Sequence, residues 1–226
     1  MRQIGALMVH VAACVLPWGL RRRVLCWCFG YEIHPTARIG LALVYPQRLV
    51  MGPHSRIGHG TVCRGITLLE LRERATIGTG NWIGGHPENG GGGYFEGETG
   101  RKSALIVEEH AAVTTRHIID CTNCVRVGRF STLAGFNSQL LTHSIDLLEG
   151  RQTSGPITIG AYCFVGTGVV ILKGSELPDF CVLGARALLQ SRLETTHTLY
   201  GGVPAKALKA LPPDAAYFTR TTGVVK

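Results

Sequence analysis

Acid–base chemistry is the first function that the residues suggest, and it centres on the segment Thr142-His143-Ser144-Ile145-Asp146. A histidine has an unperturbed pKa of about 6.5, so His143 can take a proton from an acceptor group at neutral pH. Such a base presents one ring nitrogen to its substrate while a carbonyl or carboxylate holds the other, and Asp146 is the nearest candidate. The sequence therefore predicts His143 as a general base with Asp146 as its orienting partner.

Two other groups of residues have spacings that metal or redox chemistry uses. A catalytic zinc site of the three-histidine kind would draw on His54 and His59, with His117 as the third candidate. Cys121 and Cys124 form a single CxxC pair, and no second pair matches it. We expect both cysteines to be small side chains inside the repeat described below, and we expect no metal.

The bulk composition fits one globular domain, because 45% of the 226 residues are hydrophobic and only 17% are charged. The formal net charge of +8 favours anionic partners such as lipid headgroups or phosphorylated cofactors. No RNA-binding or helix-turn-helix pattern accompanies this charge, so nucleic acid is not expected as a partner. No small-residue cleavage site follows the apolar N-terminus, which predicts a cytoplasmic protein with its eight cysteines free.

A repeat of six residues must position these groups. From Ile159 the chain divides into IGAYCF, VGTGVV, ILKGSE, LPDFCV and LGARAL, each led by an aliphatic residue that a glycine or another turn residue usually follows. The same phase occurs near the N-terminus in IHPTAR, IGLALV, YPQRLV, MGPHSR and IGHGTV. Three short strands of this kind complete one coil in 18 residues, and successive coils stack at about 4.8 Å. The repeat therefore predicts an all-β fold, a parallel β-helix.

The stacking register follows from the same count. Residues 18 apart should lie over one another, which pairs Ile39 with Ile57, Ile159 with Leu177, Val165 with Leu183, and Ile171 with Leu189. By this count Leu141 falls under Ile159, so that His143 would point outward near a corner, two places after a leading residue.

Three segments of the chain follow from this reading. Residues 1–30 are expected to form an apolar helical cap or a membrane-surface segment, 31–199 the β-helix, and 200–226 a C-terminal tail that carries GVPAK. Two loops interrupt the β-helix, at 84–104 and 147–156, and the glycine-rich first one suits a lid or an arm that reaches a neighbouring subunit. Arg21, Arg22 and Arg23 follow the apolar stretch, which predicts peripheral membrane contact and no membrane span.

The string THSIDL, followed by GPITIGAYCFVGTGVVILKGSELPDFCVLGA and LYGGVPAKALKAL, resembles the hexapeptide-repeat acyltransferases. The resemblance covers most of residues 31–211 and is strongest to galactoside and maltose acetyltransferases and to polysaccharide-biosynthesis acetyltransferases. It implies a left-handed parallel β-helix and a homotrimer with active sites between adjacent subunits. It also implies acetyl-coenzyme A as donor, and a hydroxyl or amine of a small-molecule or glycan acceptor.

The resemblance also assigns roles to single residues. His143 matches the catalytic base of the family, and the donor-binding positions fall on Phe164, Thr167, Ala185, Lys206 and Lys209. The sequence departs from the family where Gln190-Ser191 replaces a Thr-Lys pair. Two other functions stay open at this point: a zinc enzyme of the γ-carbonic-anhydrase type, and a β-solenoid that binds a partner without catalysis. Metal content separates the first from an acyltransferase, and coenzyme A binding separates the second.

Overall fold

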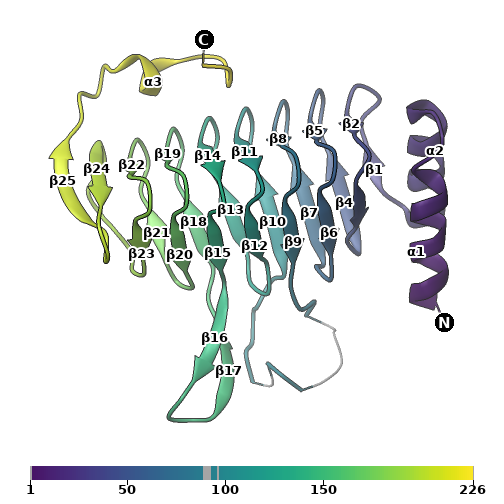
Figure 1. Cartoon of the computed structure of the whole chain (residues 1–226), viewed down its shortest axis with the longest axis horizontal. Coiled ribbons are helices and arrows are strands. Elements are labelled where there is room, and N and C mark those ends of the chain that lie inside the picture. The colour runs from purple at the N-terminus through teal and green to yellow at the C-terminus, as the bar shows by residue number, and fades with distance from the viewer. Residues whose placement is uncertain (1, 89–92, 96, 226) are drawn as a thin grey trace.

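The computed structural model describes residues 2–88, 93–95 and 97–225, and it shows a three-sided stack of parallel strands (Figure 1). The first sheet contains β1 (Glu32–Ile33), β4 (Arg48–Met51), β7 (Leu68–Leu71), β10 (Ala104–Val107), β13 (Val125–Val127), β18 (Ile157–Ile159) and β21 (Glu176–Leu177). The second contains β2 (Arg38–Ile39), β5 (Arg56–Ile57), β8 (Thr76–Ile77), β11 (Ala112–Thr115), β14 (Thr132–Phe136), β19 (Phe164–Val165), β22 (Val182–Leu183), β24 (Thr198–Gly201) and β25 (Lys206–Ala210). The third contains β3 (Leu43–Tyr45), β6 (Val62–Arg64), β9 (Trp82–Gly84), β12 (Ile118–Asp120), β15 (Gln139–Leu141), β20 (Val170–Leu172) and β23 (Leu188–Leu189).

The registers predicted from the repeat are confirmed where no insertion interrupts it. The strand pairings place Ile39 opposite Ile57, Ile159 opposite Leu177, Val165 opposite Leu183, and Ile171 opposite Leu189. The predicted fold class, a left-handed parallel β-helix, is confirmed as well, since from β1 to β24 the strands of successive coils pair in parallel within each of the three sheets.

The core is a set of inward-pointing aliphatic ladders, and tight corners enclose it. Leu69, Leu71 and Ile83 are fully buried, and burial of a side chain of this size stabilises by about 1.5–3 kcal/mol. The glycines after the leading residues are required because the backbone of the neighbouring coil leaves no room for a Cβ atom, and not only because of their φ angles. A Cβ on Gly78 would lie 2.2 Å from the carbonyl oxygen of Thr114 on the next coil, which no side chain could accommodate.

The two interruptions leave the coil at the same corner, between the third sheet and the first (Figure 1). The glycine-rich loop joins β9 to β10. The second interruption is an antiparallel hairpin of β16 (His143–Asp146) and β17 (Arg151–Ser154) between β15 and β18. This hairpin adds residues to its coil, so the register predicted for Leu141 is wrong. Leu141 pairs with Leu172, and Ile159 pairs back to Val127.

The corner between the first and second sheets carries a ladder of five stacked rings in the left-handed backbone conformation. Their φ angles lie between 48° and 59° and their centroids are 4.7–5.4 Å apart in the order His110, Phe130, Tyr162, Phe180 and His197. Stacking offsets the strain of this conformation. The tail after β25 turns back along this corner through α3 (Ala216–Thr219), and buried Phe218 packs edge-on against the ladder (Figure 1).

Two helices cover the N-terminal end of the stack, α1 (Arg2–Ala13) and α2 (Trp18–Phe29). Buried Arg21 fixes α2 to the first coil, because its guanidinium donates to the carbonyl oxygens of Gly40 and Ala42 at 2.7 and 2.8 Å. Arg22 donates similarly to the carbonyl of Ile33 at 2.9 Å. Within the part of the chain that the structure describes, no helix has both the length and the apolar character that crossing a bilayer requires.

Candidate active site

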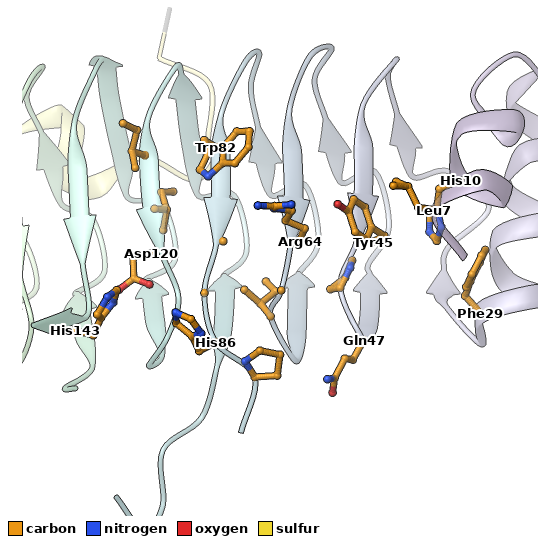
Figure 2. A pocket seen from close by; sticks show the side chains of 18 of the residues that line it. Leu7, His10, Phe29, Tyr45, Gln47, Arg64, Trp82, His86, Asp120 and His143 are labelled. Carbon is orange, nitrogen blue, oxygen red and sulfur yellow. The ribbon is translucent and has the colours of Figure 1, made fainter. Parts of the chain in front are cut away.

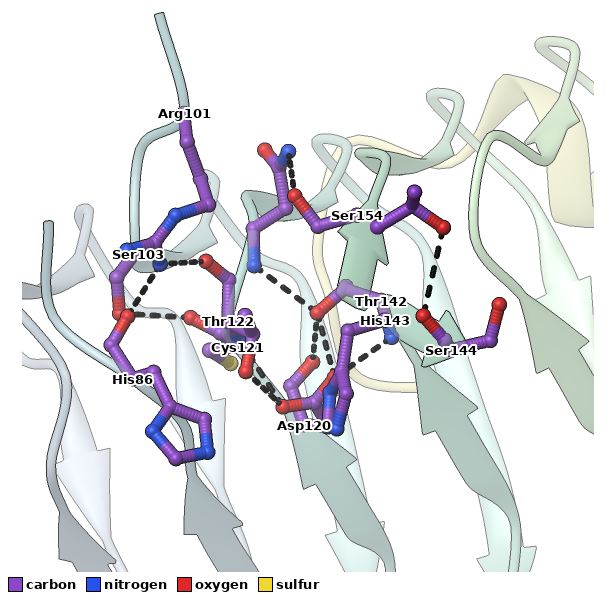
Figure 3. A network of polar contacts seen from close by, with 12 residues as sticks. His86, Arg101, Ser103, Asp120, Cys121, Thr122, Thr142, His143, Ser144 and Ser154 are labelled. Atoms are coloured by element: carbon purple, nitrogen blue, oxygen red, sulfur yellow. Dashed lines mark hydrogen bonds and ion pairs between the residues drawn. The ribbon is translucent and has the colours of Figure 1, made fainter. Parts of the chain in front are cut away.

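His143 and Asp120 form the centre of the candidate site (Figure 3). β12 and β15 are neighbouring strands of the third sheet, with Ile119 opposite Leu140, so they end side by side at one corner of the stack. Asp120 is the last residue of β12, and His143 follows β15. There the Nδ1 atom of His143 lies 2.7 Å from Oδ2 of Asp120.

Asp120 is held as an anion by a dense set of donors. Its Oδ2 also accepts hydrogen bonds from the backbone N–H and the hydroxyl of Thr142, at 2.8 and 2.6 Å. Its Oδ1 accepts from the backbone N–H and the hydroxyl of Thr122, at 3.1 and 2.7 Å. Burial alone would raise the pKa of this carboxyl, but the hydrogen bonds from His143, Thr142 and Thr122 outweigh burial and lower the pKa to about 2.

The ionised carboxylate fixes the tautomer of His143. A carboxylate accepts only, so neutral His143 carries its proton on Nδ1 and leaves Nε2 as the nitrogen that can accept a proton. The hydrogen bond to Asp120 raises the pKa of His143, against the opposing effects of partial burial and of the Lys173 ammonium. The arrangement is that of a general base whose protonated form is stabilised by a neighbouring anion.

A cleft opens beside this pair, with a cavity volume of about 790 Å³. Pockets for small molecules commonly measure roughly 300–1,000 Å³. His143 and Asp120 lie at one end of the cleft, and Phe29 and Leu7 of the N-terminal helices lie at the other (Figure 2). We call this the His143 cleft. It follows the corner between the third and first sheets over several coils.

The glycine-rich loop forms one wall at the His143 end. The rings of His86 and Phe95 each lie 6.0 Å from the ring of His143, edge-on. Arg101 lies over the Phe95 ring at 4.6 Å and donates to the carbonyl of Thr122 at 2.7 Å, as well as to the carbonyl of His86. The loop thus contacts the same short segment that binds the Asp120 carboxylate (Figure 3).

The partner predicted for His143 is wrong. Asp146 lies at the far end of β16, where its Oδ1 accepts hydrogen bonds from the backbone N–H groups of Leu148 and Glu149 at 3.0 and 3.2 Å. These bonds lower the pKa of Asp146 and assign it to the turn of the hairpin. Asp120 holds His143 in its place.

The predicted donor-binding residues lie near another corner of the stack. Thr167 and Ala185 occupy the same turn between the second and third sheets on successive coils, and the hydroxyl of Thr167 donates to the carbonyl of Phe136 at 3.0 Å. Phe164 projects from β19, where the Tyr217 ring of the tail meets it edge-on at 5.9 Å. Lys206 and Lys209 are exposed on β25, which pairs antiparallel with β24. No described contact joins any of them to His143.

The three histidines considered for zinc do not converge. His117 is fully buried, with Nε2 3.0 Å from the Thr114 hydroxyl, and its Nδ1 accepts the backbone N–H of Ser138 at 3.2 Å. Burial lowers its pKa to about 4, against a weaker raising effect of the Leu133 backbone. Over residues 2–88, 93–95 and 97–225, no three His, Cys, Asp or Glu side chains are placed to share a metal ion.

Four of the cysteines, Cys63, Cys121, Cys163 and Cys181, belong to the buried core of the repeat, whereas Cys26 and Cys28 lie on α2. All eight are free, and Cys121 of the CxxC pair is fully buried, as are Cys163 and Cys181. Burial raises the pKa of Cys121 and Cys124, which disfavours a reactive thiolate at either position.

Comparison with solved structures gives the fold a context. A variant of AntD, an N-acyltransferase from Bacillus cereus solved with dTDP-4-amino-4,6-dideoxyglucose and coenzyme A, matches with a TM-score of 0.51. The match has 14% identity and covers 84% of this chain and 89% of AntD. A hexapeptide-repeat-containing acetyltransferase from Vibrio cholerae, solved with acetyl-coenzyme A, has 16% identity and a TM-score of 0.46, covering 93% of this chain and 90% of its own.

Comparisons at the sequence level give no such match. No protein-family model matches the chain, and no curated protein matches it significantly. The structural likeness therefore shows the fold alone: the chain has a parallel β-helix fold similar to that of AntD.

Proposed function

We propose that this protein transfers an acyl group, most simply acetyl, from coenzyme A to a hydroxyl or amine of a sugar-type acceptor, with His143 as general base. The observation that carries the proposal is the 2.7 Å contact between Nδ1 of His143 and the buried Asp120 carboxylate, at the end of a cleft of ligand size. The β-helix fold, shared with an acyltransferase that was solved with coenzyme A, supports it.

The chemistry follows from the geometry of His143. Its Nε2 takes the proton of the acceptor hydroxyl or amine as the acceptor atom attacks the thioester carbon. The carbon–sulfur bond then breaks, the proton passes from Nε2 to the departing thiolate, and the products are an ester or amide and free coenzyme A. Asp120 stabilises the imidazolium between the two proton transfers, because its carboxylate stays ionised throughout.

A second copy of the chain would complete the site. The proposed donor corner is the corner that carries Thr167, just before β20, and the corner of His143 lies near Lys173, just after β20. At about 3.3 Å per residue, the two corners are roughly 20 Å apart, the width of one side of the stack. We propose a homotrimer in which the donor corner of one copy faces the His143 corner of the next. Phe164, Thr167, Ala185, Lys206 and Lys209 would then meet the donor.

The acceptor is proposed to be a sugar or glycan on two grounds. The Trp82 ring lines the His143 cleft beside polar groups, which suits a sugar ring with its apolar face and hydroxyl edges. AntD, which shares the fold, was solved with a dTDP-linked amino sugar.

The test is release of free thiol from acetyl-coenzyme A in the presence of sugars, nucleotide sugars and serine. His143→Ala is expected to lower acceptor-dependent turnover by roughly 10²–10⁴-fold while the protein stays folded and oligomeric. His34→Ala is the matched control, because His34 is exposed and its ring, among the described residues, hydrogen-bonds only to neighbouring Thr36. Retention of roughly a tenth of the turnover by His143→Ala would exclude general-base catalysis by this residue.

A further inference from the structure

The His143 cleft changes chemical character along its length. Figure 2 shows the order of its side chains from His143 and Asp120, past His86, to Arg64 and then to Tyr45 and the N-terminal helices. Asp120, Arg64 and Tyr45 lie on β12, β6 and β3 of the third sheet. At about 4.8 Å per strand, Arg64 lies roughly 10 Å from Asp120, and Tyr45 lies one strand further.

Among the described residues that line the cleft, Arg64 is the one arginine or lysine, and it lies in the middle. The Arg64 guanidinium lies over the Trp82 ring, 5.6 Å from its centroid, and within the described chain no carboxylate lies at ion-pair distance from it. Among the described residues of the cleft lining, Asp120 is the one that carries a carboxylate, and His143, Thr142 and Thr122 already occupy its oxygens. An arginine presented to a cavity without a counter-charge is suited to a phosphate group of the ligand.

Beyond Arg64 the wall is aromatic and aliphatic. The ring of His10 packs among Phe29, Tyr31 and Tyr45, at centroid distances of 4.0, 5.9 and 5.7 Å, and Leu7 lies beside them. The side-chain polar groups described at this end belong to Gln47, His10, Tyr45 and Tyr31, and the Tyr31 hydroxyl is already used in a hydrogen bond to the carbonyl of Pro46 at 2.6 Å. A nucleobase needs hydrogen-bond partners for its edges, whereas a hydrocarbon chain needs none, so this wall favours the hydrocarbon.

The apolar end of the cleft continues into an apolar surface on the two helices. Met8, Val11 and Val15 of α1 and the turn after it are exposed, and the Trp27 side chain of α2 is 90% exposed. Several large apolar side chains on one exposed cap suit contact with lipid. A ligand that is polar at His143 and apolar at Leu7 could therefore leave the cleft without exposing its chain to water.

We propose that the acceptor is a lipid-linked sugar phosphate, with the sugar at His143, the phosphate on Arg64, and the hydrocarbon chain along Tyr45 and Phe29 toward the helical cap. This inference rests on the proposed acyl transfer and names its acceptor class. The cleft selects the acceptor by recognising a phosphate with an apolar chain on one side and a sugar on the other.

The test is direct binding, measured by calorimetry on the full-length protein with farnesyl phosphate, dTDP and inorganic phosphate as probes. Farnesyl phosphate is expected to bind at least tenfold more tightly than either other probe. Arg64→Gln should weaken that binding tenfold or more, and Tyr45→Ala should weaken it severalfold. Arg56→Gln, an exposed arginine on the second sheet outside the cleft, is the matched control and should leave binding unchanged.

Three outcomes would overturn the inference: tighter Arg64-dependent binding of dTDP, which would point to a nucleotide-linked acceptor; equal binding of inorganic phosphate; or no binding of farnesyl phosphate. None of these depends on turnover. Acceptor-dependent thiol release that requires His143, together with no farnesyl phosphate binding, would leave the acyltransferase proposal intact and remove this one. Farnesyl phosphate binding without thiol release from any sugar, nucleotide sugar or polyprenyl-phosphate-linked sugar would remove the acyltransferase proposal instead.

Discussion

Replacement of Asp120 by asparagine tests the electrostatic role assigned to its carboxylate. The donors around Asp120 lower its pKa from 3.8 to about 2, and a shift of one unit corresponds to about 1.36 kcal/mol. His143 supplies one of the three groups of hydrogen bonds, and its bond has the largest lowering effect. Loss of the anion should therefore destabilise the imidazolium by about 1–2 kcal/mol, which slows the proton transfer roughly ten- to thirtyfold.

The pH profile gives Asp120→Asn a signature that a structural defect would not produce. His143 must be neutral to accept a proton, and the hydrogen bond to Asp120 raises the pKa of His143. The acid limb of the kcat/KM profile should therefore have its midpoint at a pH above the ordinary pKa of a histidine. Without the anion the acid limb should move to lower pH while the maximal rate falls. The assay is thiol release from acetyl-coenzyme A across neutral and mildly acidic pH, with the acceptor varied from below to above its KM so that kcat/KM and kcat are both obtained.

Asp146→Asn is the matched control, because Asp146 is a hairpin carboxylate that bonds only to backbone N–H groups of its own turn. It should leave both the rate and the acid limb unchanged. The reasoning is refuted if Asp120→Asn keeps wild-type turnover with an unmoved acid limb, or if Asp146→Asn reproduces its effects. Thermal denaturation at different pH values tests the direction of this effect. Because the pKa of Asp120 is lower in the folded protein, its ionised carboxylate stabilises the fold at pH values above about 3.8, and this contribution is lost as the pH falls toward 2. The Asp120→Asn protein should lack that part of the acid dependence.

Two further predictions concern the coil and the donor corner. Gly78→Ala should lower the free energy of unfolding by more than about 1–3 kcal/mol, because the added Cβ would lie 2.2 Å from a backbone oxygen of the next coil. Gly19→Ala in α2, where no atom lies within 4 Å of the added Cβ, should raise the free energy of unfolding by roughly 0.5–1 kcal/mol. Thermal melting of both variants tests this pair, and equal shifts in melting temperature would contradict it. Replacing Lys206 and Lys209 together by glutamine should raise KM for acetyl-coenzyme A severalfold with kcat unchanged, an effect that shrinks as salt is added; an unchanged KM at low salt would remove both residues from the donor site.

The fold could be read from the sequence because each coil repeats the same local rule. An aliphatic leading residue with a small turn residue after it appears once in six positions, so uninterrupted blocks give their own register. The count fails at Leu141 for a physical reason: the hairpin at 143–154 lies inside one coil, and a residue inserted there shifts every later position without changing the stack itself.

The partner of His143 was missed for the same reason. Asp120 lies one coil earlier, and that coil is longer than 18 residues: Ile119 lies opposite Leu140, and the register between β11 and β14 shifts locally. Had Leu140 been aligned with the leading residue Ile119, the segment at Thr142 and His143 would have fallen beside Asp120. The sequence carries that signal only after three residues beyond the count of 18 are allowed in that coil, since 140 − 119 is 21.

The position of the site explains why it could not arise from the repeat alone. A regular coil points apolar side chains inward and gives each corner a tight turn, which leaves no side chain free to bury a charge. The loop after β9 and the hairpin after β15 both leave the stack at the corner where β12 ends, one on each side of Asp120. Glu98 of the loop accepts hydrogen bonds from Ser154 of the hairpin, so the two insertions are joined across this corner. The coil thus supplies a rigid support for Asp120, and the insertions supply His143 and the walls that partly exclude water from it.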